Sequence, residues 1–135
     1  PYLPEEKNDV KHKCVIGVVE GDTHDIGKNL VKIMMETAGF EMYDLGRDVP
    51  LDQFIEKAKE VDADLICMST LMTTTMGGMQ TVIEKLKDQG IRDKFKVMVG
   101  GSPISKKFAD DIGAEGYSVN AVEAVKVAKE LTGIA

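Results

Sequence analysis

Tryptophan is absent from this chain of 135 residues, and aromatic residues make up only 5% of it. Long hydrophobic runs are missing too: none approaches the roughly 20 apolar residues that a membrane-spanning helix needs, so we predict no membrane span. Basic residues are in the minority, since 17 Lys and Arg stand against 23 Asp and Glu, for a net charge of -6. Because the phosphate backbone of nucleic acids attracts a basic surface, this balance argues against a nucleic-acid partner.

Cysteine is scarce as well. The two cysteines, Cys14 and Cys67, each lie within a predicted apolar strand and do not form a C-x-x-C motif. Buried thiols are therefore favoured over a redox or metal-binding role. Residues 1–12 hold two prolines and a charge cluster but no apolar core of a secretory signal, so we expect a linker or tail and a cytoplasmic location. The chain starts with proline instead of methionine, which suggests processing or the loss of a preceding segment.

Short apolar runs alternate with helical patterns from residue 13 onward, as expected for one domain over residues 13–135. Strands are predicted at 14–19, 40–44, 64–68, 96–99 and 116–119, and helices at 27–37, 51–60, 75–89, 105–111 and 121–131. Strands this apolar, separated by helices, favour a parallel sheet covered on both faces. Five such units predict an α/β, flavodoxin-like (Rossmann-like) doubly wound fold with a five-stranded parallel sheet of order 2-1-3-4-5. The crevice of this fold lies beyond the carboxyl ends of the first and third strands.

The loop after the first predicted strand carries the pattern Asp-x-His-x-x-Gly, formed by Asp22, His24 and Gly27. An aspartate that accepts the proton of one imidazole nitrogen leaves the other nitrogen free to bind a metal. The alternative is a solvated polar loop, because Asp, Thr and His are common where helices begin. The carboxylate two residues before the histidine favours the metal ligand.

The loops after the third and fourth predicted strands are rich in hydroxyls and in glycine. Residues 69–75 include five Ser or Thr side chains, of which Thr74 or Thr75 is expected to cap the following helix. The remaining hydroxyls suit contacts to an elongated ligand with scattered heteroatoms. Gly100 and Gly101 form either a bare turn or a stretch of backbone against which a large flat group can lie.

Two common occupants of this fold are excluded by the residues at the strand ends. A phospho-acceptor receiver domain needs an aspartate at the end of the third strand, where this chain has Cys67, Met68 and Ser69. A dinucleotide-binding domain needs G-x-G-x-x-G after the first strand, where this chain has two acidic residues that would repel phosphate.

Taken together, the Asp22-x-His24-x-x-Gly27 motif, Ser69-Thr70-Leu71 and the Gly100-Gly101 pair resemble the D-x-H-x-x-G, S-x-L and G-G signature of cobalamin-binding domains. Within that superfamily the chain is most similar to the corrinoid proteins of methylamine, methanol and related methyltransferase systems. The cobalamin domain of methionine synthase is similar as well. Residues 1–12 would then be the remnant of a helical segment that precedes the cobalamin domain in such proteins.

The resemblance implies that cobalamin binds base-off, with its dimethylbenzimidazole tail in a slot of the domain and cobalt bound to His24 as lower axial ligand. It implies a catalytic triad of His24, Asp22 and Thr75, the last often serine in the family. No second histidine or cysteine in the three loops completes a coordination sphere, which suits a metal that brings its own ring. Residues 116–121 are expected to close the slot. The predicted cofactor-binding residues are Asp22, Thr23, His24, Asp25, Ile26, Gly27, Ser69, Leu71, Met72, Thr73, Gly100, Gly101, Tyr117 and Ala121.

The resemblance also implies a methyl carrier, methylcobalamin in its loaded form, that works between partner enzymes. The partners are a substrate-specific methyltransferase, a second methyltransferase that demethylates the corrinoid, and a reductive activation protein, so the chain is a component and not a complete enzyme. One alternative is the cobalamin-binding subunit of an adenosylcobalamin-dependent carbon-skeleton mutase, which usually shows a glycine-rich continuation where this chain has residues 73–75. A cobalamin sensor without turnover, or a domain of this fold without a cofactor, are the others.

Overall fold

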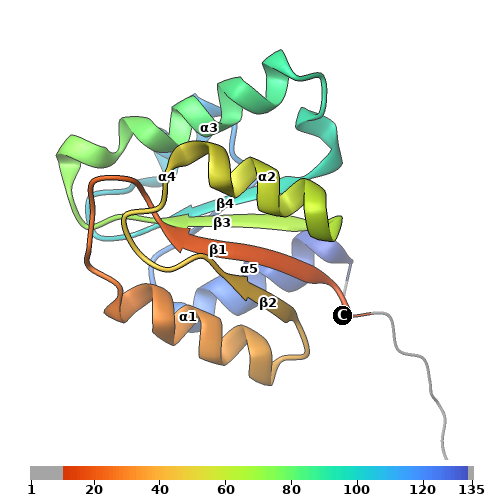
Figure 1. Cartoon of the computed structure of the whole chain (residues 1–135). Helices are drawn as coiled ribbons and strands as arrows, with labels where there is room; N and C mark the ends of the chain where they lie inside the picture. Colours follow the sequence, from red (N-terminus) through yellow and green to blue (C-terminus); the bar gives the residue numbers. More distant parts are fainter. Residues whose placement is uncertain (1–10, 134–135) are drawn as a thin grey trace, which may run out of the picture.

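The structure, a computed structural model, describes residues 11–133. Strands and α-helices alternate along this part of the chain (Figure 1). They are β1 (Lys13–Val18), α1 (Ile26–Thr37), β2 (Glu41–Asp44), α2 (Leu51–Val61), β3 (Leu65–Ser69), α3 (Gly77–Asp88), β4 (Lys96–Gly100), α4 (Lys106–Ile112), β5 (Gly116–Ser118) and α5 (Ala121–Thr132). Two 3-10 helices, η1 (Thr73–Thr75) and η2 (Arg92–Lys94), precede α3 and β4. Of the predicted tail, all but residues 11 and 12 lies outside the described residues.

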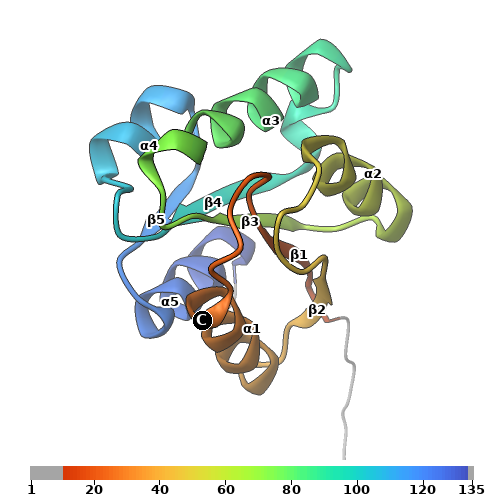
Figure 2. The ribbon, with the colours of Figure 1, turned by 60° about the vertical axis from the view of Figure 1, so that its left-hand side comes forward.

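The five strands form a single parallel sheet with the order β2-β1-β3-β4-β5, which confirms the predicted doubly wound fold. At its carboxyl edge, Val18 pairs with Ser69, Ser69 with Gly100, and Gly100 with Ser118. The last residues of four neighbouring strands therefore stand in one row. The loops that follow these strands leave the sheet side by side, so residues far apart in the sequence meet at this edge (Figure 2).

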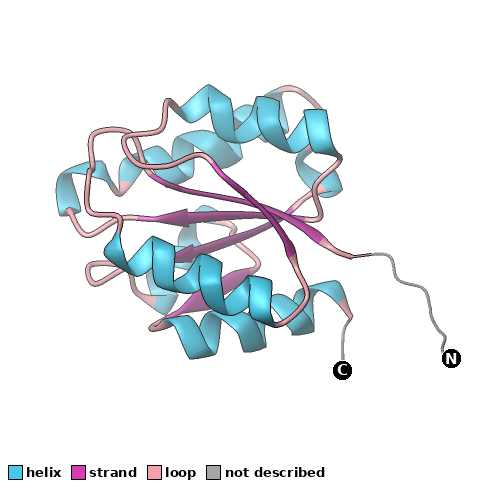
Figure 3. Cartoon of the chain, turned by 60° about the horizontal axis from the view of Figure 1, so that its bottom comes forward, coloured by secondary structure: helices cyan, strands magenta, loops and turns pink. Residues whose placement is uncertain are grey.

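Helices cover both faces of the sheet. Figures 1 and 2 show α2, α3 and α4 on one face, and α1 with α5 on the other, which Figure 3 brings forward. Because successive strand residues point to opposite faces, Val15 belongs to the core beneath α2 and α3 whereas Ile16 belongs to the core beneath α1 and α5. The second core also contains Cys14 and Cys67 as free, buried thiols, as predicted. Burial raises the pKa of Cys67 to about 12.

The predicted helix over residues 75–89 was wrong at its start. The structure has the η1 turn followed by α3, and the N-cap of α3 is Met76, with neither Thr74 nor Thr75 in that position. The hydroxyl of Thr75 is directed backward, toward the carbonyl oxygen of Met72 and the hydroxyl of Thr70, so it does not cap the helix. Most other element ends fall within about one residue of the predicted ones. Among the described residues, no helix combines the length and apolar character needed to span a bilayer.

Candidate functional site

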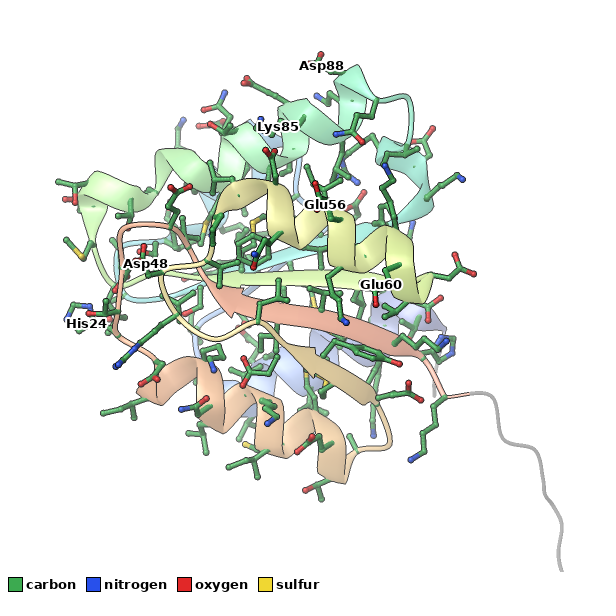
Figure 4. The ribbon with its side chains drawn as sticks, viewed as in Figure 1. His24, Asp48, Glu56, Glu60, Lys85 and Asp88 are labelled. Carbon is green, nitrogen blue, oxygen red and sulfur yellow. The ribbon has the colours of Figure 1, made fainter. Side chains whose placement is uncertain are left out.

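His24 lies in the loop between β1 and α1 and projects from the carboxyl edge of the sheet (Figure 4). Its Nδ1 lies 2.6 Å from Oδ1 of Asp22. Asp22 is fully buried, whereas 55% of the His24 side chain is exposed. Because an ionised carboxylate can only accept hydrogen bonds, Nδ1 carries a proton, and in the neutral imidazole Nε2 is then the nitrogen with the lone pair. His24 therefore presents a half-exposed imidazole at the carboxyl edge of the sheet, with one ring nitrogen available to a ligand.

The carboxylate of Asp22 accepts hydrogen bonds on both oxygens. Oδ1 accepts the backbone N–H of His24 at 2.9 Å in addition to the imidazole, and Oδ2 accepts the hydroxyl of Thr70 at 2.6 Å and the backbone N–H of Leu71 at 2.7 Å. Burial by itself raises the pKa of Asp22, but the hydrogen bonds from Thr70, His24 and Leu71 outweigh burial and hold the pKa well below its usual range. Asp22 is thus an ionised group that fixes the tautomer of His24.

Thr75, the predicted third member of the triad, reaches Asp22 only through Thr70. The hydroxyls of Thr70 and Thr75 are hydrogen-bonded to each other, and the Thr70 hydroxyl is the one that contacts the carboxylate. Sequence reasoning missed Thr70, which occupies the unspecified middle position of Ser69-Thr70-Leu71. Its position directly after β3, next to the β1 loop, was the available signal.

Asp48, in the loop between β2 and α2, supports the histidine loop from its other side (Figure 4). The backbone N–H of Asp48 donates to the carbonyl oxygen of Asp22 at 2.8 Å, and Oδ1 of Asp48 accepts the N–H of Gly21 at 2.8 Å. Asp48 adopts a left-handed backbone conformation, with φ of 50°, which aspartate tolerates better than most residues. These reciprocal bonds fix the backbone on which Asp22 and His24 stand.

A second anchor lies at the start of α1. Lys28 is 98% buried, and its Nζ donates to both carboxylate oxygens of Asp44, at 2.8 and 2.9 Å, at the end of β2. Burial opposes ionisation of Asp44, but hydrogen bonds from Lys28 and from the N–H of Gly46 lower the pKa of Asp44 overall. This ion pair ties the first turn of α1 to the sheet.

A cleft of about 240 Å³ opens beside His24, on the face covered by α1 and α5. It contains seven of the predicted cofactor-binding residues, His24, Gly27, Ser69, Leu71, Gly100, Gly101 and Ala121. Residues 118–121, which belong to the segment predicted to close the slot, also line the cleft. Sequence reasoning missed further lining residues, namely Ile16, Lys28, Leu30, Val31, Cys67, Met68, Ser102 and Ala124. Helical spacing offered a signal for some, since Leu30 and Val31 follow Gly27 by three and four positions, and Ala124 follows Ala121 by three.

The other predicted residues do not line the cleft. Asp22 lies beneath His24, while Thr23, Asp25 and Ile26 lie in or next to its loop. Met72, Thr73 and Thr75 belong to the connection between β3 and α3. Tyr117 packs against the core beneath α2 and α3, and its hydroxyl donates to the carbonyl oxygen of Ile104 at 3.1 Å.

Gly101 lines the cleft and also allows two loops to approach each other closely. Its φ of 126° lies in the region that favours glycine, and a Cβ atom there would lie 1.8 Å from the carbonyl oxygen of Thr70. The absence of a side chain at Gly101 is therefore required for the loop after β4 to approach the loop after β3, which is the loop that carries Thr70.

The model of the B12-binding domain family matches residues 12–126 of this chain. The chain belongs to this family. This B12-binding domain is 57% identical over 130 residues to the dimethylamine corrinoid protein of Methanosarcina barkeri, a match that covers 96% of the chain and 61% of the relative. The predicted resemblance to corrinoid proteins is thereby confirmed.

Solved structures agree. The B12-binding domain matches the monomethylamine corrinoid protein of Methanosarcina barkeri with a TM-score of 0.86 and 40% identity, covering 89% of this chain and 57% of that one. It matches a chain of the methanol:cobalamin methyltransferase complex of the same organism with a TM-score of 0.85 and 32% identity, covering 94% of this chain and 49% of that one. The chain thus spans less than two thirds of the length of each of these relatives.

The donor set of the B12-binding domain suits a metal held by its own ring. Within residues 11–133, no group of three or more His, Cys, Asp or Glu side chains could hold an ion. His24 instead offers one imidazole nitrogen at the edge of a mostly apolar cleft. The residues present fit cobalamin, a cofactor that brings its metal within a ring of its own.

Proposed function

We propose that this domain binds cobalamin in the base-off form, with His24 as the lower axial ligand of cobalt. The observation that carries this proposal is the pair of His24 and Asp22, 2.6 Å apart, beside the cleft. The carboxylate holds the proton on Nδ1, so Nε2 is the nitrogen that would bind cobalt. An ionised partner also raises the basicity of the imidazole, which strengthens its bond to a metal.

The cleft would hold the dimethylbenzimidazole tail. Its walls are the first turns of α1 and α5, and its lining includes the small residues Gly27, Gly100 and Ala121. Small side chains leave room for a large planar group, and apolar neighbours such as Leu71 favour it over water. Hydroxyl groups of Ser69 and Ser118 are available for its polar atoms.

We further propose that the protein carries a methyl group between partner enzymes. When bound, cobalamin supplies a cobalt ion that can accept and release a methyl group. His24 would bind and leave the metal as the preferred coordination number of cobalt changes. When it leaves, Nε2 can take up a proton, and the carboxylate of Asp22 stabilises the resulting imidazolium.

The partners proposed are a substrate-specific methyltransferase, a second methyltransferase that demethylates the corrinoid, and a reductive activation protein. The names of the relatives support this choice, since they include dimethylamine and monomethylamine corrinoid proteins and a methyltransferase complex. The 57% identity to a dimethylamine corrinoid protein favours a methylamine as the source of the methyl group, and a methyl carrier over a mutase subunit.

Replacement of each histidine tests the axial ligand. The chain has two histidines. His12 directly precedes β1 and does not line the cleft, so His12→Ala is a matched control for His24→Ala. We expect hydroxocobalamin bound to the wild type and to His12→Ala to show one visible spectrum, and His24→Ala to show that of a water-ligated, base-off cofactor. Electron paramagnetic resonance of the cobalt(II) form with 15N-labelled histidine should show coupling to the protein nitrogen. An unchanged spectrum in His24→Ala would refute the assignment of His24 as the ligand of cobalt.

A further inference from the structure

We propose that Thr70 is the positioning residue that couples Asp22 to the hydroxyl groups of the β3–α3 connection, and that Thr75 acts on Asp22 only through it. This inference rests on the proposed axial role of His24. It extends the ligand network from a triad to a chain of four side chains, in the order His24, Asp22, Thr70 and Thr75.

The direction of each hydrogen bond follows from the chemistry of the groups. Oδ2 of Asp22 can only accept, so the 2.6 Å bond uses the single hydroxyl hydrogen of Thr70. The bond between the two threonines is then donated by Thr75, whose single hydroxyl hydrogen is shared between the Thr70 hydroxyl and the carbonyl oxygen of Met72. Thr75 therefore orients the lone pairs of Thr70, while Thr70 alone touches the carboxylate.

Thr70 is also the better anchored of the two threonines. It is fully buried, its N–H donates to the carbonyl oxygen of Gly100 at 3.2 Å, and its carbonyl group lies against Gly101. The hydroxyl of Thr75 is part-buried and has a second acceptor, the carbonyl oxygen of Met72 at 3.1 Å. Loss of the Thr75 hydroxyl leaves all four donors to Asp22 in place, whereas loss of the Thr70 hydroxyl leaves Oδ2 with the N–H of Leu71.

The consequence for His24 is a matter of orientation. An Asp22 carboxylate held on both oxygens presents Oδ1 to Nδ1 in one direction, so the imidazole plane is fixed before the metal arrives. A carboxylate that keeps only the N–H of Leu71 on Oδ2 is held less firmly, so it can rotate more easily, and the ring can rotate with it. Removal of a group that orients a metal ligand in this way typically lowers metal affinity roughly 10- to 100-fold.

Four variants test the assignment: Thr70→Val, Thr70→Ala, Thr70→Ser and Thr75→Val. With hydroxocobalamin at fixed pH, we expect the fraction of cofactor ligated by His24 to fall in Thr70→Val, corresponding to a roughly 10- to 100-fold smaller ligation constant. Thr70→Ser keeps the hydroxyl and should restore the wild-type spectrum, and Thr75→Val should have the smaller effect. Thr70→Ala removes the hydroxyl without adding a methyl group beside the carboxylate, and it replaces Thr70→Val if that variant does not fold.

A readout without cofactor completes the test. Nitrogen NMR of His24 in the unloaded chain reports which ring nitrogen carries the proton, and we expect the Nδ1–H preference to weaken in Thr70→Val but to persist in Thr37→Val, an exposed control whose hydroxyl bonds only within α1. An effect of Thr75→Val equal to or larger than that of Thr70→Val, or a wild-type spectrum in Thr70→Val, overturns the inference alone. If His24→Ala gives the same spectrum as the wild type, His24 is not the ligand, and the proposed function fails together with this inference.

Discussion

Replacement of Gly27 by alanine should stabilise the unloaded chain and weaken cofactor binding. Gly27 is the second residue of α1 and has a negative φ, and a Cβ atom built on it meets nothing within 4 Å. Alanine at a compatible helical position gains about 0.4–1 kcal/mol, chiefly by reducing the entropy of the unfolded chain. For a chain of this length that corresponds to a rise in Tm of about 1.5–3.5 °C.

The same methyl group would stand at the edge of the cleft, because Gly27 is one of its lining residues. If the cofactor tail fills that space, an extra methyl group costs about 1–3 kcal/mol in overpacking, which is a roughly 5- to 150-fold weaker affinity. Thermal unfolding of the unloaded chain gives the first quantity, and equilibrium dialysis with hydroxocobalamin gives the second.

Gly77 provides the matched control. It is the first residue of α3, its added Cβ also meets nothing within 4 Å, and it does not line the cleft. Gly77→Ala should therefore raise Tm by a similar amount and leave cofactor affinity unchanged. Equal affinities for the Gly27→Ala and Gly77→Ala variants would refute the placement of the cofactor in this cleft. A Tm of Gly27→Ala below that of the wild type would refute the conclusion that the backbone at Gly27 accepts alanine without strain.

Three further predictions address the supports of the site and the second core. Asp48→Gly keeps a residue that tolerates the left-handed backbone but removes the oxygen that accepts the N–H of Gly21. Its free energy of unfolding in urea should be about 1 kcal/mol lower than that of Asp62→Gly, a control at the other left-handed aspartate. Equal values would contradict the support that Asp48 gives to the histidine loop. Asp44→Asn should cost about 1.5–3 kcal/mol at pH 7. Because the pKa of Asp44 is lowered in the folded chain, this stabilisation is present above pH about 4 and is lost as the pH falls through the folded-state pKa. Urea unfolding at decreasing pH should therefore show the wild type and Asp44→Asn approaching the same free energy of unfolding. A difference between them that does not change with pH would refute the ion pair. Cys14, which is fully buried, does not line the cleft and has a pKa raised by burial, should resist thiol reagents in the folded chain, so rapid labelling would contradict its burial.

The architecture was predictable because it depends on patterns that local sequence carries. Apolar strands and amphipathic helices alternate in a way that few folds accommodate, and five such units favoured the doubly wound sheet whose order the structure confirms. The pairing of His24 with Asp22 was predictable for a similar reason, since the two residues are neighbours in one loop. The structure confirms their contact at 2.6 Å.

Contacts between loops were harder to predict. Sequence reasoning assigned the hydroxyl of the network to Thr75, and the structure brings Thr70 to the carboxylate instead. Which of several threonines meets a given oxygen depends on how the chain leaves β3, and there Gly101, from the loop after β4, lies against Thr70. Tyr117 illustrates the same difficulty, because the alternation of a three-residue strand decides which face it joins, and one position reverses the answer.

The two cores of the sheet differ in how complete they are. Beneath α2, α3 and α4, large side chains such as Phe54 and Ile83 fill the space along the strands, whereas the core beneath α1 and α5 gives way to the cleft near the carboxyl edge. Local opening should therefore begin where α1 and α5 border that gap, and their amides should exchange with solvent sooner than those of α2 and α3. A ligand in the cleft would act as the missing part of a hydrophobic core, so that occupancy, folding cooperativity and resistance to proteolysis would rise together.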